Sequence, residues 1–393
     1  MKSKKQLDKI WTIFLSGGEG KRMQPYTKTQ SKTLIPLINN FPISEFILYS
    51  LVSELGMRDF VFTVKGIKNY RDVQNYFQGG SGWSAKLDIE PQVNFEYQDP
   101  NYDDEGSADS SLYNIRRFQI DTPILVVPND NFIRTEDIYQ MYDLARKSDK
   151  SFIVGLYEVD APSKYGVVKL ADDGISVESF IEKPKNYQGK GLINTSFYII
   201  KPDVFEYFKG DFGKDTLPRL TALGKVGGYE LKHTWLDLGS PQKHLAATLG
   251  LFKKPLPYIM NYLRRICSKV PHADVWVRGT GRFSKKTAKE ILERILIGDI
   301  KVDGTVFIGK DCFIGSNVTL KNCSVGDICV IGDNCRIEDS NIMDAWNIGD
   351  SVTIKHSMLG RVGVIGHRVQ IKDSYIADDV KIRSGGVFKD KVV

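Results

Sequence analysis

The chain has 393 residues, enough for two or three domains, with 41% hydrophobic and 26% charged residues, the composition of an ordinary globular protein. Its net charge of +6 is modest and no long basic run occurs, which argues against nucleic acid as a partner. The five cysteines are an odd number without a CxxC pair, so neither a disulfide framework nor a zinc site is indicated.

The first residues carry no targeting or membrane segment. The start, residues 1–9, is basic, but the apolar run after it covers only Ile10–Leu15 and breaks at Gly17-Gly18. That run is too short for a signal core or a membrane span. We therefore expect a cytoplasmic location and no membrane partner.

Residues 1–250 alternate short apolar runs with stretches of helical spacing. The pattern predicts strands and one early helix, in chain order Ile10–Leu15, the helix Ser44–Gly56, Phe60–Val64, Pro123–Val127 and Phe152–Tyr157. Strands that alternate with helices indicate βαβ units and a mainly parallel sheet. We expect a Rossmann-like α/β domain here.

Residues 251–300 form a connector. Pro255 and Pro257 interrupt it early, and apolar residues then line one face of a helix predicted over Lys285–Ile297. Ser284 is its expected N-cap, and Gly298 marks its end.

Residues 301–393 repeat with a period of 17. Apolar residues recur in three phases, and five isoleucines mark the first: Ile314, Ile331, Ile348, Ile365 and Ile382. One large inward side chain about every six residues is what a triangular coil of three flat sides requires. We therefore expect a parallel β-helix, and its resemblance to hexapeptide repeats indicates the left-handed form.

The loop after the first strand is rich in glycine. It contains Ser16, Gly17, Gly18 and Gly20, followed by the cations Arg22 and Lys32. Backbone N–H groups of such a turn can approach phosphate oxygens, although a plain strand-to-helix turn gives the same pattern. The loop matches neither the Walker sequence nor GxGxxG.

This loop resembles the signature of the sugar-1-phosphate nucleotidylyltransferases, roughly GGxGxRLxPxT followed by KPxxP. Further segments resemble the family in the same order: Gly106-Ser107-Ala108-Asp109, Pro128-Asn129-Asp130, Tyr165-Gly166-Val167-Val168, Phe180-Ile181-Glu182-Lys183-Pro184, Asn194-Thr195-Ser196-Phe197-Tyr198 and Trp235-Leu236-Asp237-Leu238-Gly239-Ser240. The resemblance covers residues 11–250, and an appended β-helix is common in the family.

The resemblance implies transfer of a nucleotidyl group from a nucleoside triphosphate to a hexose 1-phosphate, with Mg²⁺ as cofactor. Asp130 and Asp237 would hold the metal, and each follows an apolar run that should end at the ligand-binding edge of the sheet. Either aspartate alone could equally be a turn residue.

Further roles follow from the same resemblance. Arg22 would stabilise the leaving pyrophosphate, Lys32 would neutralise the triphosphate, and Lys183 would bind the sugar phosphate. The expected nucleotide contacts also include Gln98, which would read the base edge, with Gly106 and Ser107. The expected sugar contacts also include Tyr165, Gly166, Glu182 and Asn194. Without Tyr165-Gly166 nearby, Glu182 and Lys183 would be interpreted as a solvated pair at a turn.

Four positions depart from the family pattern without removing a charged group. They are Lys21, Thr33, Asn129 and Ser196. These departures concern the shape of the loop and the choice of base or sugar rather than the reaction.

Three alternatives remain open. GDP-mannose synthesis rivals ADP-glucose synthesis, which the segments 106–109 and 211–215 favour by resemblance. A regulatory subunit without activity would have the same fold, although it would have no reason to keep Arg22, Lys32, Asp130, Lys183 and Asp237. Acyl transfer on the β-helix would use His356 or His367, but no long loop interrupts the repeat. We expect a homo-oligomer, with an open sheet edge near Ile382–Val393.

Overall fold

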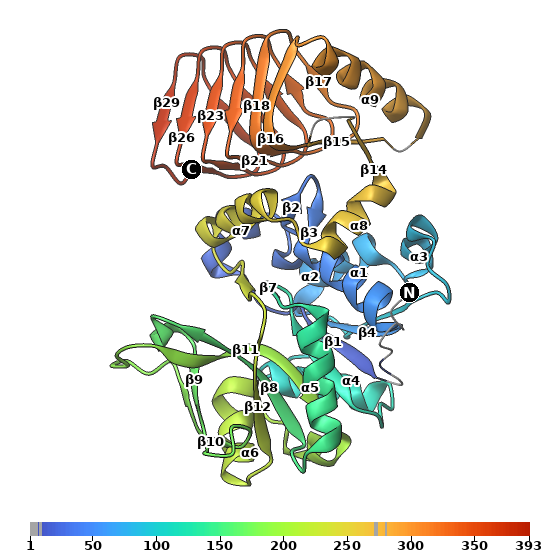
Figure 1. Ribbon diagram of the computed structural model, residues 1–393, viewed down its shortest axis with the longest axis vertical. Helices are drawn as coiled ribbons and strands as arrows, with labels where there is room; N and C mark the ends of the chain where they lie inside the picture. Colours follow the sequence, from blue (N-terminus) through green and yellow to red (C-terminus); the bar gives the residue numbers. More distant parts are fainter. Residues whose placement is uncertain (1–6, 8–9, 271–273, 280) are drawn as a thin grey trace. The chain divides into compact units, whose positions relative to one another are not determined.

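The computed structural model describes residues 7, 10–270, 274–279 and 281–393 (Figure 1). The chain divides into two compact units, one built from residues up to 18 and 47–236, the other from 19–46 and 237–393. The division crosses helix α1 (Ile43–Leu55) and the glycine-rich loop, where it separates Gly17 and Gly18 from Gly20 and the cations that follow. The domain boundaries expected near 250 and 300 stay a prediction, because these compact units are cut elsewhere.

The first unit is built on a nine-stranded sheet. Its strands are β1 (Trp11–Leu15), β4 (Asp59–Thr63), β5 (Asn94–Tyr97), β6 (Ile124–Pro128), β8 (Phe152–Val159), β9 (Gly166–Leu170), β10 (Val177–Glu182), β11 (Gly191–Ile200) and β12 (Val226–Glu230). Strand β1 lies between β4 and β6, parallel to both, and β11 joins β6 in the antiparallel sense. The mixed α/β fold is confirmed, and the five elements predicted in this unit occur within two residues of their expected ends.

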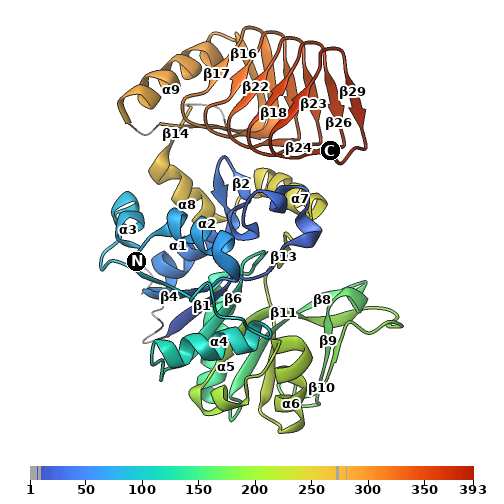
Figure 2. The same cartoon turned by 180° about the vertical axis from the view of Figure 1, so that it is seen from behind.

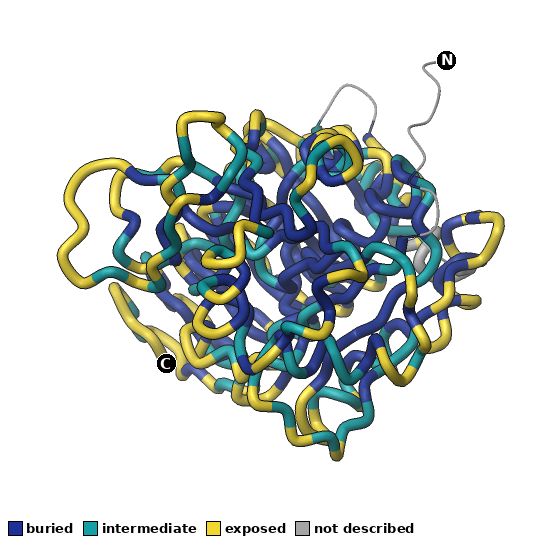
Figure 3. The backbone as a smooth tube through the Cα atoms, turned by 90° about the horizontal axis from the view of Figure 1, so that it is seen from below, coloured by how far each residue is buried: buried dark blue, intermediate teal, exposed yellow. Residues whose placement is uncertain are grey.

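Helices cover this sheet. They are α2 (Gly66–Phe77), α3 (Ser81–Leu87), α4 (Ser107–Arg117), α5 (Thr135–Lys147) and α6 (Leu217–Ala222). Helix α4 packs on β4, and α5 packs on β8 and β11 (Figure 2). Exposed stretches of backbone fall largely in the loops (Figure 3).

The second unit contains the repeat as a parallel β-helix. Its strands β16 (Ile300–Ile308), β17 (Phe313–Ile314), β18 (Val318–Val325), β19 (Val330–Ile331), β20 (Arg336–Glu338), β21 (Asn341–Ile342), β22 (Trp346–Ile348), β23 (Thr353–Lys355), β24 (Met358–Leu359), β25 (Gly363–Ile365), β26 (Gln370–Lys372), β27 (Tyr375–Ile376), β28 (Val380–Ile382) and β29 (Val387–Lys389) stack in successive coils (Figure 1). Ile314 pairs with Ile331 and Ile331 pairs with Ile348, so 17 residues form one coil of the β-helix.

The inside of the β-helix is apolar, as the periodicity predicts. The three repeating phases form one buried core, and Cys312, Cys323, Cys329 and Cys335 are buried in it as free thiols. Each inward side chain stacks on its equivalents in neighbouring coils. Burial of this column stabilises coils in which every strand after β18 is only two or three residues long.

Among the described residues from 237 onwards, α-helices accompany the coils of the second unit. They are α7 (Pro241–Lys253), α8 (Pro257–Ile266) and α9 (Gly281–Leu296), and α9 packs on β15 (Val275–Arg278) and β16 at the start of the coils. Helix α9 begins four residues before the predicted Lys285, so Ser284 lies inside the helix and is not its cap; its side chain lies outside the described part. The expected basic start, residues 1–9, also falls outside it apart from Leu7.

Candidate active site

The glycine-rich loop leaves the middle of the parallel sheet. Ser16 follows β1, is buried, and donates its backbone N–H to the carbonyl of Thr63 on β4 at 2.9 Å. Gly17 passes beside Lys65, and Gly18 is exposed. The loop therefore presents backbone at the carboxyl ends of the strands, where open parallel sheets bind ligands.

Gly20 needs to be glycine for two reasons. Its φ of 67° lies in the left-handed region, and a Cβ there would come within 2.7 Å of the Thr27 side chain. The same added atom would lie 3.2 Å from Cβ of Lys32, so Gly20 and Lys32 are neighbours in the second unit. The spacing of the motif thus brings a tight turn next to a cation.

Asp130 lies where the sequence predicts. Strand β6 ends at Pro128, and a two-residue turn of Asn129 and Asp130 leads to the short strand β7 (Asn131–Phe132). Asn129 is buried, while the Asp130 side chain is half-buried. Its carboxylate therefore stands at the same strand edge as the glycine-rich loop.

Gln98 is held inside the first unit. It is 0% exposed, its amide oxygen accepts from Ser110 and Asn114, and its amide nitrogen donates to the Val64 carbonyl at 3.0 Å. Contact with a base would require these bonds to open. The arrangement explains how Gln98 fixes α4 to the strand edge, and the base-reading role stays a prediction.

The start of α4 carries the second expected nucleotide loop. Ser107 Oγ donates to Asp211 at 3.0 Å, and a Cβ on Gly106 would lie 2.6 Å from the Gly210 carbonyl. Backbone of the two segments packs too closely for any side chain at Gly106. Gly106 and Ser107 therefore lie beside the segment 211–215.

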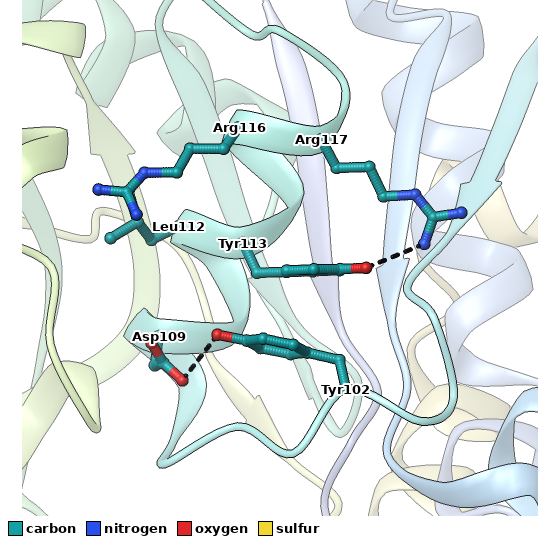
Figure 4. Close-up of a pocket in the computed structure, with 6 residues that line it drawn as sticks. All are labelled: Tyr102, Asp109, Leu112, Tyr113, Arg116 and Arg117. Atoms are coloured by element: carbon teal, nitrogen blue, oxygen red, sulfur yellow. Dashed lines mark hydrogen bonds between the residues drawn. The ribbon is translucent and has the colours of Figure 1, made fainter.

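A pocket of about 480 Å³ lies on the outer side of α4 (Figure 4). Its floor is the stacked pair Tyr102 and Tyr113, with ring centroids 3.9 Å apart. Tyr102 donates to Asp109 at 3.1 Å, and Arg117 donates to the Tyr113 hydroxyl at 3.3 Å. These contacts hold the segment before Gly106 against the helix.

The expected sugar side forms a second group in the first unit. The backbone N–H of Lys183 donates to the Tyr165 carbonyl at 3.1 Å, and its ammonium pairs with Glu182 at 2.7 Å. A Cβ on Gly166 would come within 2.8 Å of the Glu182 carboxylate, so glycine leaves room for this side chain. Asn194 is buried and donates to Tyr198 at 2.9 Å.

Aromatic side chains lie beside the residues expected to bind the sugar. Trp235 lies edge-on to Tyr165, with ring centroids 5.5 Å apart, and 5.9 Å from Tyr157. Such rings offer a flat apolar surface beside the charged pair Glu182 and Lys183. A sugar ring has a matching combination of apolar faces and hydroxyl edges.

In the second unit Arg22 lies next to the loop that carries Asp237. A Cβ placed on Gly239 would be 2.8 Å from Asp237 Oδ1 and 3.1 Å from Arg22 Nη2. The N–H of Gly239 donates to Asp237 Oδ1 at 2.8 Å, and the ammonium of Lys243 pairs with Oδ2. The guanidinium of Arg22 and the carboxylate of Asp237 therefore both lie beside Gly239.

The segment that carries Arg22 and Lys32 is anchored on the β-helix. Tyr26, 0% exposed, donates its hydroxyl to the Met358 carbonyl at 2.8 Å, and Asn39 donates to the Val325 carbonyl at 2.9 Å. Arg278 lies over the Phe41 ring at 4.5 Å and pairs with Asp327 at 2.6 Å. The two cations thus depend on the repeat for their position.

His244 on α7 makes this unit sensitive to acid. It is buried, and desolvation lowers the pKa of its imidazole from 6.5 to about 4. The unfolded chain binds this proton more readily than the folded chain does. The contribution of neutral, buried His244 to the free energy of unfolding is therefore complete above pH 6.5 and is lost as pH falls toward 4. We expect the free energy of unfolding to fall by about 3 kcal/mol across this window.

Urea unfolding at pH 7.5 and pH 5, followed by the fluorescence of Trp276 and Trp346, measures this dependence. His244→Gln should flatten the difference between the two pH values. His233, which is only half-buried and pairs with Asp137 at 3.0 Å, provides the control. An equal pH dependence in wild type and His244→Gln would contradict the assignment.

The metal-binding role expected of Asp130 and Asp237 stays a prediction. Asp130 lies in the first unit and Asp237 in the second, and carboxylate oxygen is the ligand type that Mg²⁺ prefers. Within the described residues no group of three or more His, Cys, Asp or Glu side chains could hold a metal by itself. Phosphate oxygens of the substrates and water would complete the coordination.

The two histidines of the repeat have contacts between coils. His356 lies 2.8 Å from Asp373, and His367 accepts from the backbone N–H of Asp350 at 3.0 Å. Each partner is 17 residues away, the height of one coil. Both histidine side chains therefore have a structural role, because each links neighbouring coils at a corner of the β-helix.

Three site partners were missed at the sequence level. Lys65 lies beside Gly17 and donates to the Asp104 carbonyl at 2.8 Å, Asp211 holds Ser107, and Lys243 pairs with Asp237. Lys243 follows Asp237 by six residues on the first turn of α7, a spacing that could have indicated it. Lys65 and Asp211 lie far along the chain from their partners.

Comparisons with known proteins identify the family of this chain. Residues 11–254 match the family model described as nucleotidyl transferase, and residues 296–393 match the GMPPB C-terminal domain. Glucose-1-phosphate adenylyltransferase 1 of Vibrio cholerae is 24% identical over 62% of this chain and 66% of its own length.

Two further relatives cover more of the chain. Mannose-1-phosphate guanylyltransferase 1 of Arabidopsis thaliana is 25% identical over 78% of this chain and 75% of its own length. Glucose-1-phosphate adenylyltransferase of Aliivibrio fischeri is 23% identical over 80% and 86%. Among the described residues no helix has the length and apolarity needed to cross a membrane.

Proposed function

The chain belongs to the nucleotidyl transferase family as a sugar-1-phosphate nucleotidyltransferase, and we propose that it joins a nucleoside triphosphate to a hexose 1-phosphate. Pyrophosphate is the second product. The observation that carries the proposal is the position of Arg22 beside Gly239, where an added Cβ would lie 3.1 Å from Arg22 Nη2 and 2.8 Å from Asp237 Oδ1. Glucose 1-phosphate is the favoured sugar, and mannose 1-phosphate is the alternative.

The proposed chemistry is in-line displacement between two anions. An oxygen of the sugar phosphate attacks the α-phosphorus, and the bond to pyrophosphate breaks. The attacking oxygen is already ionised, so no general base is needed. The enzyme has to neutralise charge and align the reactants.

The charged residues divide this work. We assign Arg22 and Lys32 to the triphosphate, where the guanidinium binds the leaving pyrophosphate. We assign Lys183 to the sugar phosphate and Glu182 to the sugar hydroxyls. Asp130 and Asp237 would hold Mg²⁺, which neutralises phosphate charge when it is bound.

The backbone contacts proposed for the nucleotide involve the two glycine loops. Ser16, Gly17, Gly18 and Gly20 would approach the phosphates, with Gly106 and Ser107 next to the base and ribose. Gln98 supports this second loop from inside. We also propose that the enzyme is cytoplasmic, because its proposed substrates are soluble anions.

Pyrophosphate release with Mg²⁺, across a grid of nucleoside triphosphates and sugar 1-phosphates, tests the proposal. The grid covers the five common bases and four hexoses, with the Asp130→Asn variant as the negative control. One strong combination that the variant lacks would identify the substrates. A blank grid with folded protein would favour a regulatory subunit without activity.

A further inference from the structure

Strand β12 is followed by an irregular stretch that leads to the sugar side of the first unit. Residues 231–235, all within the described part of the chain, form neither helix nor strand. They end at Trp235, whose ring lies edge-on to Tyr165 with centroids 5.5 Å apart. The backbone N–H of Leu231 donates to the Leu156 carbonyl on β8 at 2.8 Å. Beyond this bond, the path of the stretch depends on side-chain contacts, because no hydrogen-bonded ladder fixes it.

The carboxylate of Asp137 contacts this part of the chain at three points. Asp137 lies on the first turn of α5 and is 1% exposed. Its Oδ1 accepts from the Tyr229 hydroxyl at 3.2 Å and from the Lys232 backbone N–H at 3.0 Å. Its Oδ2 lies 3.0 Å from Nδ1 of His233, and an ionised carboxylate can only accept, so the ring donates. All three donors come from residues 229–233.

Stability alone does not explain a carboxylate at this buried position. A buried carboxylate is costly without partners, and replacing buried ionic contacts with apolar packing is often neutral or stabilising. The neighbouring Glu136 shows the ordinary arrangement on α5, since it is exposed and pairs with Arg134 at the surface. The three bonds of Asp137 are better explained by the position that they give to residues 229–233.

The ring of Trp235 depends on this position because it lacks a hydrogen bond of its own. Its indole Nε1 is buried, and no partner for it occurs among the described residues. Ring contacts with Tyr165 and Tyr157 hold it, and these are not directional enough to fix a ring alone. Trp235 follows His233 by two residues, so a displacement of His233 moves the ring as well.

We propose that Asp137 is a positioning residue for the sugar side. Its carboxylate fixes residues 229–233 and, through them, the Trp235 ring beside which the sugar would lie. The inference rests on the proposed function, which assigns a hexose 1-phosphate to this place. Affinity for the sugar 1-phosphate should therefore depend on Asp137. Affinity for the triphosphate, which we assign to the glycine loops, should not.

Steady-state kinetics of two substitutions test this role. Asp137→Ala removes all three bonds, whereas Asp137→Asn keeps the size and one acceptor oxygen and serves if the alanine variant does not fold. KM for the sugar 1-phosphate should rise ~10-fold in Asp137→Ala and less in Asp137→Asn. KM for the triphosphate should stay within about twofold in both. Glu136→Ala, at the exposed neighbouring position, is the matched control and should change neither value.

The two KM values separate a positioning role from a general structural one. Folded Asp137 variants with an unchanged KM for the sugar 1-phosphate overturn the inference, and so does an equal rise in both KM values. A wild type that is inactive on every substrate combination would instead overturn the proposed function. The position of the Trp235 ring then has to be measured without turnover.

Fluorine NMR of protein labelled with fluorotryptophan makes that measurement. Trp235→Phe assigns the Trp235 signal. Asp137→Asn should shift or broaden this signal and leave those of Trp11 and Trp83, which lie in the same unit, in place. A Trp235 signal that does not change overturns the positioning role, whether or not the wild type is active.

Discussion

Replacement of Asp130 with Asn is expected to lower kcat for pyrophosphate release about 10³-fold while the protein remains folded. Asparagine has nearly the same size but lacks the negative charge that a divalent cation needs from its ligand. The side chain ends a turn directly after the buried strand β6, so its position depends on the sheet rather than on its own charge. The loss should therefore appear in the chemistry and not in stability.

The measurement is steady-state pyrophosphate release at several Mg²⁺ concentrations, together with thermal unfolding. Asp172→Asn is the matched control, because Asp172 is exposed in the turn between β9 and β10. Activity of Asp130→Asn within twofold of the wild type would contradict a role in metal binding. A variant that recovers activity only at raised Mg²⁺ would support weakened metal affinity.

The repeat could be predicted from the sequence because its signal is local and periodic. Each coil uses the same 17 residues, so phase, inward residues and strand pairing follow from one count. The α/β domain was predictable for a related reason, since short apolar runs between helical stretches indicate buried parallel strands. Asp130 follows directly from the end of such a strand.

The anchoring of the segment 19–46 on the β-helix could not be predicted. Tyr26 and Met358 are 332 residues apart, and nothing in a motif near Tyr26 indicates that partner. The surroundings of Gln98 could not be predicted either. Asn114 donates to its amide oxygen, which belongs to the amide that a base would use. Ser196, which replaces a usual glycine, has φ 65°, a left-handed conformation that glycine adopts more readily.

The exposed corner residues of the β-helix could not be predicted from the sequence either. Ile328 and Val362 follow the apolar pattern of neighbouring inward positions, and sequence alone does not separate inside from outside at a corner. Only their positive φ and their exposure distinguish them. Local preference and observed structure therefore disagree at these two residues.

The second large effect is expected from Gly239→Ala. The added methyl group would lie 2.8 Å from Asp237 Oδ1 and 3.1 Å from Arg22 Nη2, so at least one of these groups has to move. A displacement of about 1 Å in a group that aligns reactants can reduce kcat about 10²-fold. Gly239 lies outside the left-handed region, so alanine adds no backbone strain, and the effect should be confined to the site.

Gly250→Ala is the matched control for this substitution. Gly250 lies in the same helix that follows the Asp237 loop, and a Cβ there has no atom within 4 Å. It should keep full activity and gain roughly 0.5–1 kcal/mol of stability, because alanine favours a helix interior over glycine. If Gly239→Ala kept its kcat as well, Arg22 and Asp237 would not need their observed positions beside Gly239, and the guanidinium would have to act from another position. A fall in kcat with unchanged thermal stability would instead tie the leaving-group cation to the carboxylate loop.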